Sequence, residues 1–253
     1  MIETIDHADG IRELRLARPP VNALDPGLIA ALRDAVEQAP AQGAQALLIS
    51  GRSGMYSAGL DIPVLLTLDD TALARCFEDF FGLMAALARS PVPIAAAITG
   101  HSPAGGAVIA LFCDYRVMAR GAWRIGLNEV QVGLTVPAMI QGALTRLLGA
   151  YRAERLLVAG QMLEAEDALR LGFVDELADA DEVPQRARQW LQQLLALPRQ
   201  AMLETRALAR ADLVQATARE RWPLAQFAGM WRRPETQATL RALVARLKAG
   251  KGG

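Results

Sequence analysis

The residues of this sequence that could do chemistry lie mainly in two glycine-rich loops. The first loop reads "GRSGMYSAGLD", from Gly51 to Asp61, and the second opens the stretch "GHSPAGGAVIALFCDY" that begins at Gly100. Each loop follows a short apolar run and leads into apolar residues at helical spacing. Neither loop contains Gly-x-Gly-x-x-Gly, and the first lacks a Gly-Lys-Ser/Thr ending, so the nucleotide-binding motifs are absent.

Free backbone N–H groups are the chemistry that such loops offer. The N–H groups in the first turn of a helix have no intrahelical acceptor, and their partial positive charge can stabilise a negatively charged oxygen. One such loop alone is more simply a turn, but two in successive strand–loop–helix units favour an oxyanion site. Gly105 and Gly106 suit this role, because a side chain there would keep a substrate away from the backbone.

Other reactive side chains are scarce. The only histidines are His7 and His101, which excludes a histidine-rich metal centre and argues against a Ser–His–Asp triad. Cys76 and Cys113 each lie in an apolar, helical context, which indicates core thiols and no thiolate metal site. The remaining candidate for proton transfer is Glu129 in "IGLNEVQVGL", although a glutamate taken at random is far more often a surface residue.

Composition restricts the class of protein. The 253 residues include 27 Lys and Arg and 27 Asp and Glu, so the formal net charge is zero and no general nucleic-acid binder is indicated. Hydrophobic residues make up 52% of the chain. Every apolar run nevertheless ends well short of the roughly 20 residues that a membrane span needs. Met1 leads directly into the strand-like "IETI" with no secretion signal, so we expect a cytoplasmic protein.

The elements that must position these loops follow an α/β pattern. "IETIDHADGIRELRLAR" alternates around Asp9-Gly10, which predicts two antiparallel strands, and Asp25 before Pro26 predicts the start of a helix. The apolar runs "AQALLIS" and "IAAAIT" predict buried strands, the second ending at Gly100, and the phenylalanine-rich segment between them predicts a long helix. Repeated strand, glycine loop and helix indicate an α/β core over residues 1–196.

The C-terminal part of the sequence, residues 197–253, has a different composition. Leu, Ala, Arg and Gln dominate it, and Pro223 and Pro234 mark helix starts or breaks. It carries more apolar residues than a small outlying helical segment could bury alone. We therefore expect a helical region that packs on the core or on a neighbouring subunit, and an oligomeric protein.

Three motifs resemble the crotonase (enoyl-CoA hydratase/isomerase) superfamily. They are "SAGLD" at 57–61, "PAGGAVIALFCDYRVMA" at 103–119 and "IGLNEVQVGL" at 125–134, and "RPPVNAL" near the N-terminus also fits. The details "SPAGG", "CDYR" and "IGLNE" are most similar to the delta(3)-delta(2)-enoyl-CoA isomerases. The resemblance implies a spiral of ββα units with two sheets and a C-terminal helical region, and subunits assembled as trimers or dimers of trimers.

The resemblance also implies a substrate and a mechanism. The substrate is an acyl thioester of coenzyme A, with no metal and no further cofactor, and the N–H groups of Ala58 and Gly105 hold its thioester oxygen. The family's hydratases use two glutamates, but one of those positions is Val108 here, so Glu129 is the single acid–base group. A lone carboxylate beside apolar residues has a raised pKa and can carry a proton from carbon 2 of a 3-enoyl-CoA to carbon 4.

Further residues receive weaker assignments by motif position. We expect Asp61 to cap its loop, His101 to be structural, and Asp114 and Arg116 to form a buried polar contact. Substrate contacts are assigned to Ala23, Leu24, Ser57, Ala58, Gly59, Leu60, Asp61, Gly105, Gly106 and Asn128.

Two kinds of alternative function stay open. Within the superfamily, the sequence is compatible with a hydratase, a dienoyl-CoA isomerase or a thioester hydrolase, although Val108 counts against efficient hydration because it cannot hold water. Outside enzymes, a protein that binds acyl-CoA without turning it over would keep the same fold. Intact Ala58, Gly105 and Glu129 argue against that reading.

Overall fold

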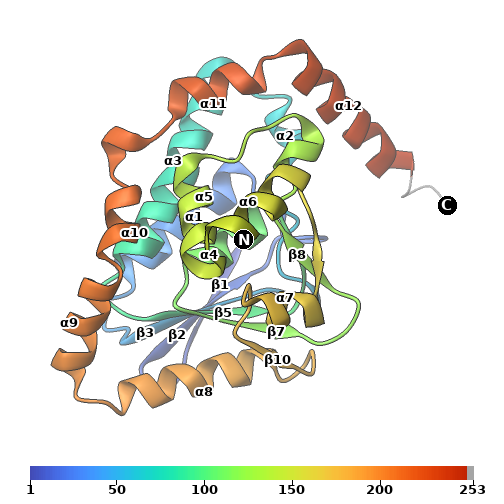
Figure 1. Ribbon diagram of the computed structural model, residues 1–253. Coiled ribbons are helices and arrows are strands. Elements are labelled where there is room, and N and C mark those ends of the chain that lie inside the picture. The colour runs from blue at the N-terminus through green and yellow to red at the C-terminus, as the bar shows by residue number, and fades with distance from the viewer. Residues whose placement is uncertain (250–253) are drawn as a thin grey trace.

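A six-stranded sheet forms the centre of the computed structural model, which describes residues 1–249 (Figure 1). Its strand order is β1-β2-β3-β5-β7-β10, in which β1 runs antiparallel to β2 and all other neighbours are parallel. The predicted hairpin around Asp9-Gly10 is confirmed by the β1–β2 pair. The strands are β1 (Ile2–Asp6), β2 (Ile11–Leu16), β3 (Ala46–Ser50), β5 (Ile94–Ile98), β7 (Tyr115–Ala119) and β10 (Glu176–Ala178).

A second, four-stranded sheet takes the strand that follows each of β3, β5 and β7. Its order is β4-β6-β8-β9, and its strands are β4 (Gly54–Met55), β6 (Gly100–Pro103), β8 (Arg124–Gly126) and β9 (Leu163–Glu164). Gly100 therefore begins a further strand, where the sequence predicted only the end of one. The recurring order of two strands and a helical segment is the predicted spiral of ββα units.

Local sequence signals explain the two long helices of the core. Asp25 caps α1 (Pro26–Gln38) by accepting a hydrogen bond from the Leu28 N–H at 2.8 Å, and a proline occupies the first turn as predicted. Asp69 caps α3 (Asp70–Arg89) in the same way, and α3 ends before the prolines of "SPVP". Both helices carry one apolar face, so they pack against each other and on the sheet.

The middle of the chain contains several shorter elements. The helix α4 (Gly105–Leu111) follows β6 directly, and the three short elements at Ile62–Leu65, Glu129–Val132 and Ala165–Leu171 were not predicted. The remaining elements of this part are α2 (Ile62–Leu65), the 3₁₀ helix η1 (Glu129–Val132), α5 (Ala138–Leu148), α6 (Ala150–Ala159), α7 (Ala165–Leu171) and α8 (Val183–Leu195).

Helices cover both faces of the large sheet. On one face, α8 packs over a small cluster that includes Ile11, Leu48, Val117 and Leu191 (Figure 1). On the other face, α1, α3 and α4 contribute to the main hydrophobic core. Within residues 1–249, no helix combines the length and apolarity that crossing a membrane requires.

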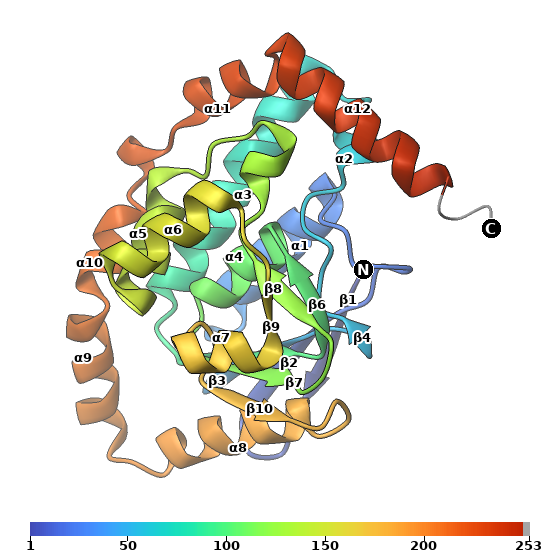
Figure 2. The ribbon, with the colours of Figure 1, turned by 45° about the vertical axis from the view of Figure 1, so that its right-hand side comes forward.

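The C-terminal region wraps around this core as a chain of helices (Figures 1 and 2). The ring of Phe227 lies edge-to-face against Phe77 of α3, with centroids 4.7 Å apart, and Trp231 packs on the same ring. The region thus packs on its own core, while residues 250–253 of the predicted segment lie outside the described residues. Its elements are α9 (Arg199–Ala209), α10 (Ala211–Ala216), the 3₁₀ helix η2 (Arg219–Arg221), α11 (Leu224–Trp231) and α12 (Pro234–Ala249).

A partly buried carboxylate also joins this region to the core. Asp114 accepts hydrogen bonds from Arg206 at 2.8 Å and from Arg210 at 2.9 Å. The predicted polar contact between Asp114 and Arg116 is made through the backbone, because Arg116 Nη2 donates to the Asp114 carbonyl at 3.4 Å. The two side chains do not pair, because the Arg116 guanidinium pairs with Asp175 at 2.7 Å. The true partners of Asp114 come from α9 and its end, far along the chain.

Candidate active site

The loop at residues 57–61 is held against residues 21–24 by a ladder of hydrogen bonds. Asn22, a buried residue in the left-handed region (φ 50°), donates from Nδ2 to the Tyr56 carbonyl at 3.0 Å. Ser57 Oγ donates to the Asn22 carbonyl at 2.8 Å and accepts from the Gly59 N–H at 3.2 Å. The Leu24 N–H donates to the Gly59 carbonyl at 2.8 Å. The motifs "VNAL" and "SAGLD" therefore form one unit.

This ladder decides which N–H of the loop is free. The Ala58 N–H donates to the Val21 carbonyl at 3.0 Å, and the Asp61 N–H donates to the Leu24 carbonyl at 3.0 Å. Among the residues that the structure describes, the Leu60 N–H has no acceptor. The Ala58 N–H is therefore not free to act as the predicted oxyanion donor, and the Leu60 N–H is the free candidate of this loop.

The second candidate donor is the N–H of Gly105, at the first position of α4. Ala104, before it, has a strained backbone (φ 46°, ψ −117°) and is fixed by donating its N–H to the Gly126 carbonyl at 2.8 Å. A Cβ added to Gly105 would lie 3.4 Å from the Leu60 nitrogen and 2.8 Å from Leu24 Cδ1. A side chain here would displace Leu24 Cδ1 and crowd the Leu60 nitrogen, so the backbone of Gly105 lies close to the Leu60 N–H.

Glu129 is the first residue of the 3₁₀ helix η1. It follows Gly126 by three residues, and the Gly126 carbonyl accepts the hydrogen bond from the Ala104 N–H described above. The residue as a whole is partly exposed, but its Oε2 atom is inaccessible to solvent and has no hydrogen-bond partner within residues 1–249. Burial raises the pKa of this carboxyl from 4.5 to about 7. A carboxyl with a buried, unpaired oxygen and such a pKa can accept and return a proton near neutral pH.

The sequence profile of the family described as "Enoyl-CoA hydratase/isomerase" matches residues 6–229. The chain belongs to the enoyl-CoA hydratase/isomerase family. The human protein "Enoyl-CoA delta isomerase 1, mitochondrial" is 30% identical over 251 residues, which cover 98% of this chain and 83% of that relative. A "Probable enoyl-CoA hydratase" of Mycolicibacterium paratuberculosis is 32% identical over 224 residues, covering 83% of this chain and 84% of the relative.

Solved structures of the family have the same fold. The crystal structure of human mitochondrial delta3-delta2-enoyl-CoA isomerase gives a TM-score of 0.93 at 27% identity and covers 99% of both chains. An enoyl-CoA hydratase from Mycobacterium ulcerans gives a TM-score of 0.81 at 29% identity, covering 91% of this chain and 99% of that one. The crotonase fold predicted from the motifs is confirmed by these matches.

Three other residues of the predicted site, Asp61, His101 and Gly106, make hydrogen bonds or packing contacts within the protein. Asp61 caps α2 through the Val64 N–H at 3.2 Å and pairs with Arg18 at 2.7 Å, so its carboxylate is occupied. His101 accepts from the Arg124 N–H at 3.1 Å. Gly106 permits close packing, because a Cβ there would lie 2.6 Å from the Ser57 carbonyl oxygen. The predictions of structural roles for Asp61 and His101 agree with these bonds.

The remaining residues predicted to contact the substrate differ in burial. Leu24 is fully buried and its Cδ1 borders Gly105, while Ala23 beside it is also buried. Asn128 precedes η1, is partly exposed, and makes no capping bond through its side chain. Val108 is 1% exposed and sits in α4, in the same first turns as Gly105. No group of three or more potential metal-ligating side chains occurs in the described part of the chain.

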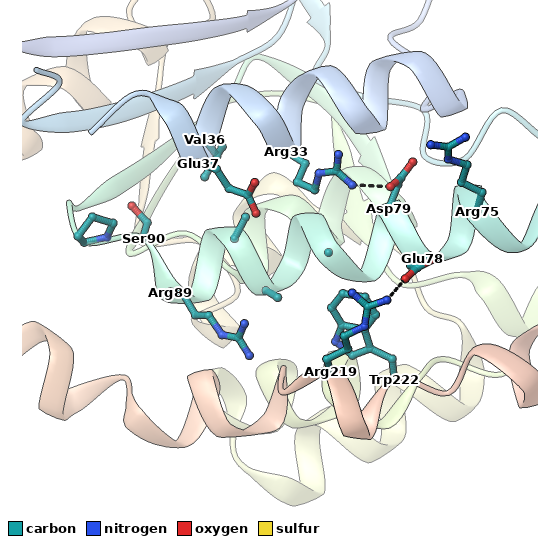
Figure 3. A pocket seen from close by; sticks show the side chains of 14 residues that line it. Arg33, Val36, Glu37, Arg75, Glu78, Asp79, Arg89, Ser90, Arg219 and Trp222 are labelled. Carbon is teal, nitrogen blue, oxygen red and sulfur yellow. Dashed lines mark hydrogen bonds and ion pairs between the residues drawn. The ribbon is translucent and has the colours of Figure 1, made fainter. Parts of the chain in front are cut away.

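A charged groove of this protein lies elsewhere, between α1, α3 and η2 (Figure 3). Its lining includes none of the catalytic candidates. Arg33 pairs with Asp79 across α1 and α3, and Arg219 of η2 pairs with Glu78 while stacking over Trp222. These pairs neutralise much of the charge in the groove and connect η2 to α3. We therefore interpret the charged residues of the groove as structural.

Proposed function

We propose that this protein moves the double bond of a 3-enoyl-CoA from carbons 3–4 to carbons 2–3, giving the 2-trans-enoyl-CoA. This reaction belongs to the β-oxidation of unsaturated fatty acids. The observation that carries the proposal is the solitary Glu129 carboxyl, whose Oε2 atom is buried and has no partner in the described chain, and whose pKa is raised by burial to about 7. A single acid–base group of this kind suits a proton shuttle and not the activation of a water molecule by a pair of carboxylates.

The steps follow from the donors and the base. The Glu129 carboxylate takes a proton from carbon 2, and the electron pair of that C–H bond moves toward the thioester carbonyl to form a dienolate. The N–H groups of Leu60 and Gly105 stabilise the charge on the thioester oxygen, each by about 3 kcal/mol. The Glu129 carboxylic acid then returns the proton to carbon 4, so no water and no redox cofactor is consumed.

Val108 supports isomerisation over hydration. It occupies the position that carries the second glutamate in the hydratases of the family, and its apolar side chain is buried in the main core. Hydration remains the second candidate, because relatives at similar identity are named as probable enoyl-CoA hydratases. We further propose a cytoplasmic homotrimer, which light scattering of the purified protein would test by a mass three times that of the chain.

Two substrates separate the candidate functions. Isomerisation of 3-hexenoyl-CoA creates a conjugated enoyl thioester, whose ultraviolet absorbance appears with time, whereas hydration of 2-hexenoyl-CoA removes the same absorbance. We expect turnover of the first substrate to exceed turnover of the second, and Glu129→Gln to abolish it. Preferred hydration would replace the isomerase assignment, and binding of both substrates without turnover of either would indicate a non-catalytic acyl-CoA binder.

A further inference from the structure

The turn that carries Glu129 is held from two sides by hydrogen bonds to other helices. On one side, Gln131 Nε2 donates to the Gly160 carbonyl, at the end of α6, at 2.9 Å. On the other side, the hydroxyl of Thr236 in α12 donates to the Gly133 carbonyl at 3.0 Å. The second bond joins the C-terminal helix to the 3₁₀ helix that contains the proposed base.

Gly133 is directly connected to the backbone of Glu129. The Leu134 N–H donates to the Glu129 carbonyl at 3.1 Å, and the Gly133 N–H donates to the Val130 carbonyl at 3.2 Å, which closes the turn. Gly133 has φ +77°, a conformation that favours glycine. A bond that fixes the Gly133 carbonyl therefore restricts the whole turn, including the direction in which the Glu129 side chain leaves it.

The contact between α12 and the turn is close, and its α12 side is buried although Gly133 itself is exposed. Thr236 is 1% exposed, and Leu240, one turn further along α12, is fully buried. A Cβ added to Gly133 would lie 3.1 Å from Thr236 Oγ1 and 3.3 Å from its Cα, so the helix rests directly on this glycine. A buried hydroxyl loses hydrogen bonds to water, and the Gly133 carbonyl replaces one of them.

The same helix reaches the other half of the site. Beside η1, α12 also packs on α2, the helix capped by Asp61 immediately after Leu60 (Figure 2). The helix α12 thus contacts both α2, which follows the candidate oxyanion donor Leu60 in sequence, and η1, which carries the candidate base Glu129. Within the described residues, α12 makes no hydrogen bond to Glu129 Oε2 or to the N–H groups of Leu60 and Gly105, so its influence acts through position.

We propose that Thr236 is a positioning residue for Glu129, holding η1 through the Gly133 carbonyl so that the carboxyl stays buried at the site. The proposal rests on the proposed function, because it assigns Thr236 an effect on the proton-transfer step. Thr236 touches neither substrate nor base. Its loss lets the turn move, so the carboxyl spends less time in the geometry that proton transfer requires.

The test compares three variants at matched positions. Thr236→Val keeps the branched shape and removes the hydroxyl, and Thr236→Ser keeps the hydroxyl. Thr239→Val is the control, because the Thr239 hydroxyl lies in the same helix and donates within it to the Glu235 carbonyl at 2.9 Å. We expect kcat of Thr236→Val on 3-hexenoyl-CoA to fall about 10- to 100-fold, as for a misplaced catalytic group, with KM little changed. Thr236→Ser and Thr239→Val should retain near-normal kcat.

Hydrogen exchange gives a second readout that does not depend on activity. The amides of residues 129–134 should exchange faster in Thr236→Val than in Thr239→Val, while those of α3 stay unchanged. Equal kcat and equal exchange in these two variants would overturn the proposal, as would a serine variant as impaired as the valine one. Thr236→Ala replaces the valine variant if the latter does not fold.

The two proposals fail in different ways. If Glu129→Gln retains turnover, the proposed function fails, whatever the Thr236 variants do. If Glu129→Gln is inactive while Thr236→Val keeps its kcat, only the positioning role fails.

Discussion

Replacing Glu129 with glutamine should stabilise the protein at alkaline pH while removing its activity. In the unfolded chain this carboxyl titrates near 4.5, and in the folded protein burial raises its pKa to about 7. Between these two values the folded state keeps a proton that the unfolded state has lost. Below pH 4.5 the carboxyl is protonated in both states and does not lower the free energy of unfolding. As the pH rises from 4.5 through 7, the free energy of unfolding falls, because the folded state must either hold the proton or bury a charge.

The size of the effect follows from the shift in pKa. One pKa unit corresponds to about 1.4 kcal/mol, so a shift from 4.5 to about 7 costs the folded state on the order of 3 kcal/mol once the carboxyl is ionised. Glutamine has nearly the same shape and is neutral at every pH. Its advantage in free energy of unfolding should thus be near zero at pH 4.5 and on the order of 3 kcal/mol at pH 8.5.

Thermal melting at the two pH values measures this difference. For a chain of this length, an advantage of that size raises the melting temperature by about 5–10 °C. Glu154→Gln provides a control, since Glu154 is exposed on α6 and its substitution should change melting little at either pH. A melting advantage of Glu129→Gln that is the same at both pH values would refute the inference that Glu129 is a buried, proton-binding carboxyl.

Three further predictions concern catalysis and the attachment of the C-terminal region. Below pH 7, kcat/KM for 3-hexenoyl-CoA should fall about tenfold per pH unit, because Glu129 with its pKa of about 7 must be ionised to accept a proton; a flat profile between pH 5 and 8 would contradict this. Gly105→Ala should lower kcat/KM about 10²- to 10³-fold, because its Cβ would crowd the donor pair, whereas Gly142→Ala, with no atom within 4 Å of the added Cβ, should be active. Asp114→Asn should lower the free energy of unfolding by about 2 kcal/mol through the weakening of two partly buried arginine pairs, while Asp167→Asn, at an exposed pair, should cost less than about 1 kcal/mol. Equal costs in urea titrations would show that the Asp114 pairs do not anchor the C-terminal region.

The sequence alone determined the elements whose causes are local. Asp9-Gly10 specified a hairpin and Asp25-Pro26 a helix start, because turn and cap preferences depend on residues a few positions apart. The order and spacing of the glycine loops and of "IGLNE" identified the family, and with it the fold. Glu129 was found in the same way, through its position in the motif "IGLNE".

Only the tertiary structure decided which groups are free to act. The choice between the N–H of Ala58 and that of Leu60 depends on the Val21 carbonyl, which reaches the loop from another part of the chain. Burial of the Glu129 carboxyl and the bond from Thr236 to Gly133 depend on packing between segments that are distant in sequence. Local preferences specify where a strand or helix begins, whereas the availability of a donor and the pKa of a carboxyl are set by whatever the folded chain brings beside them.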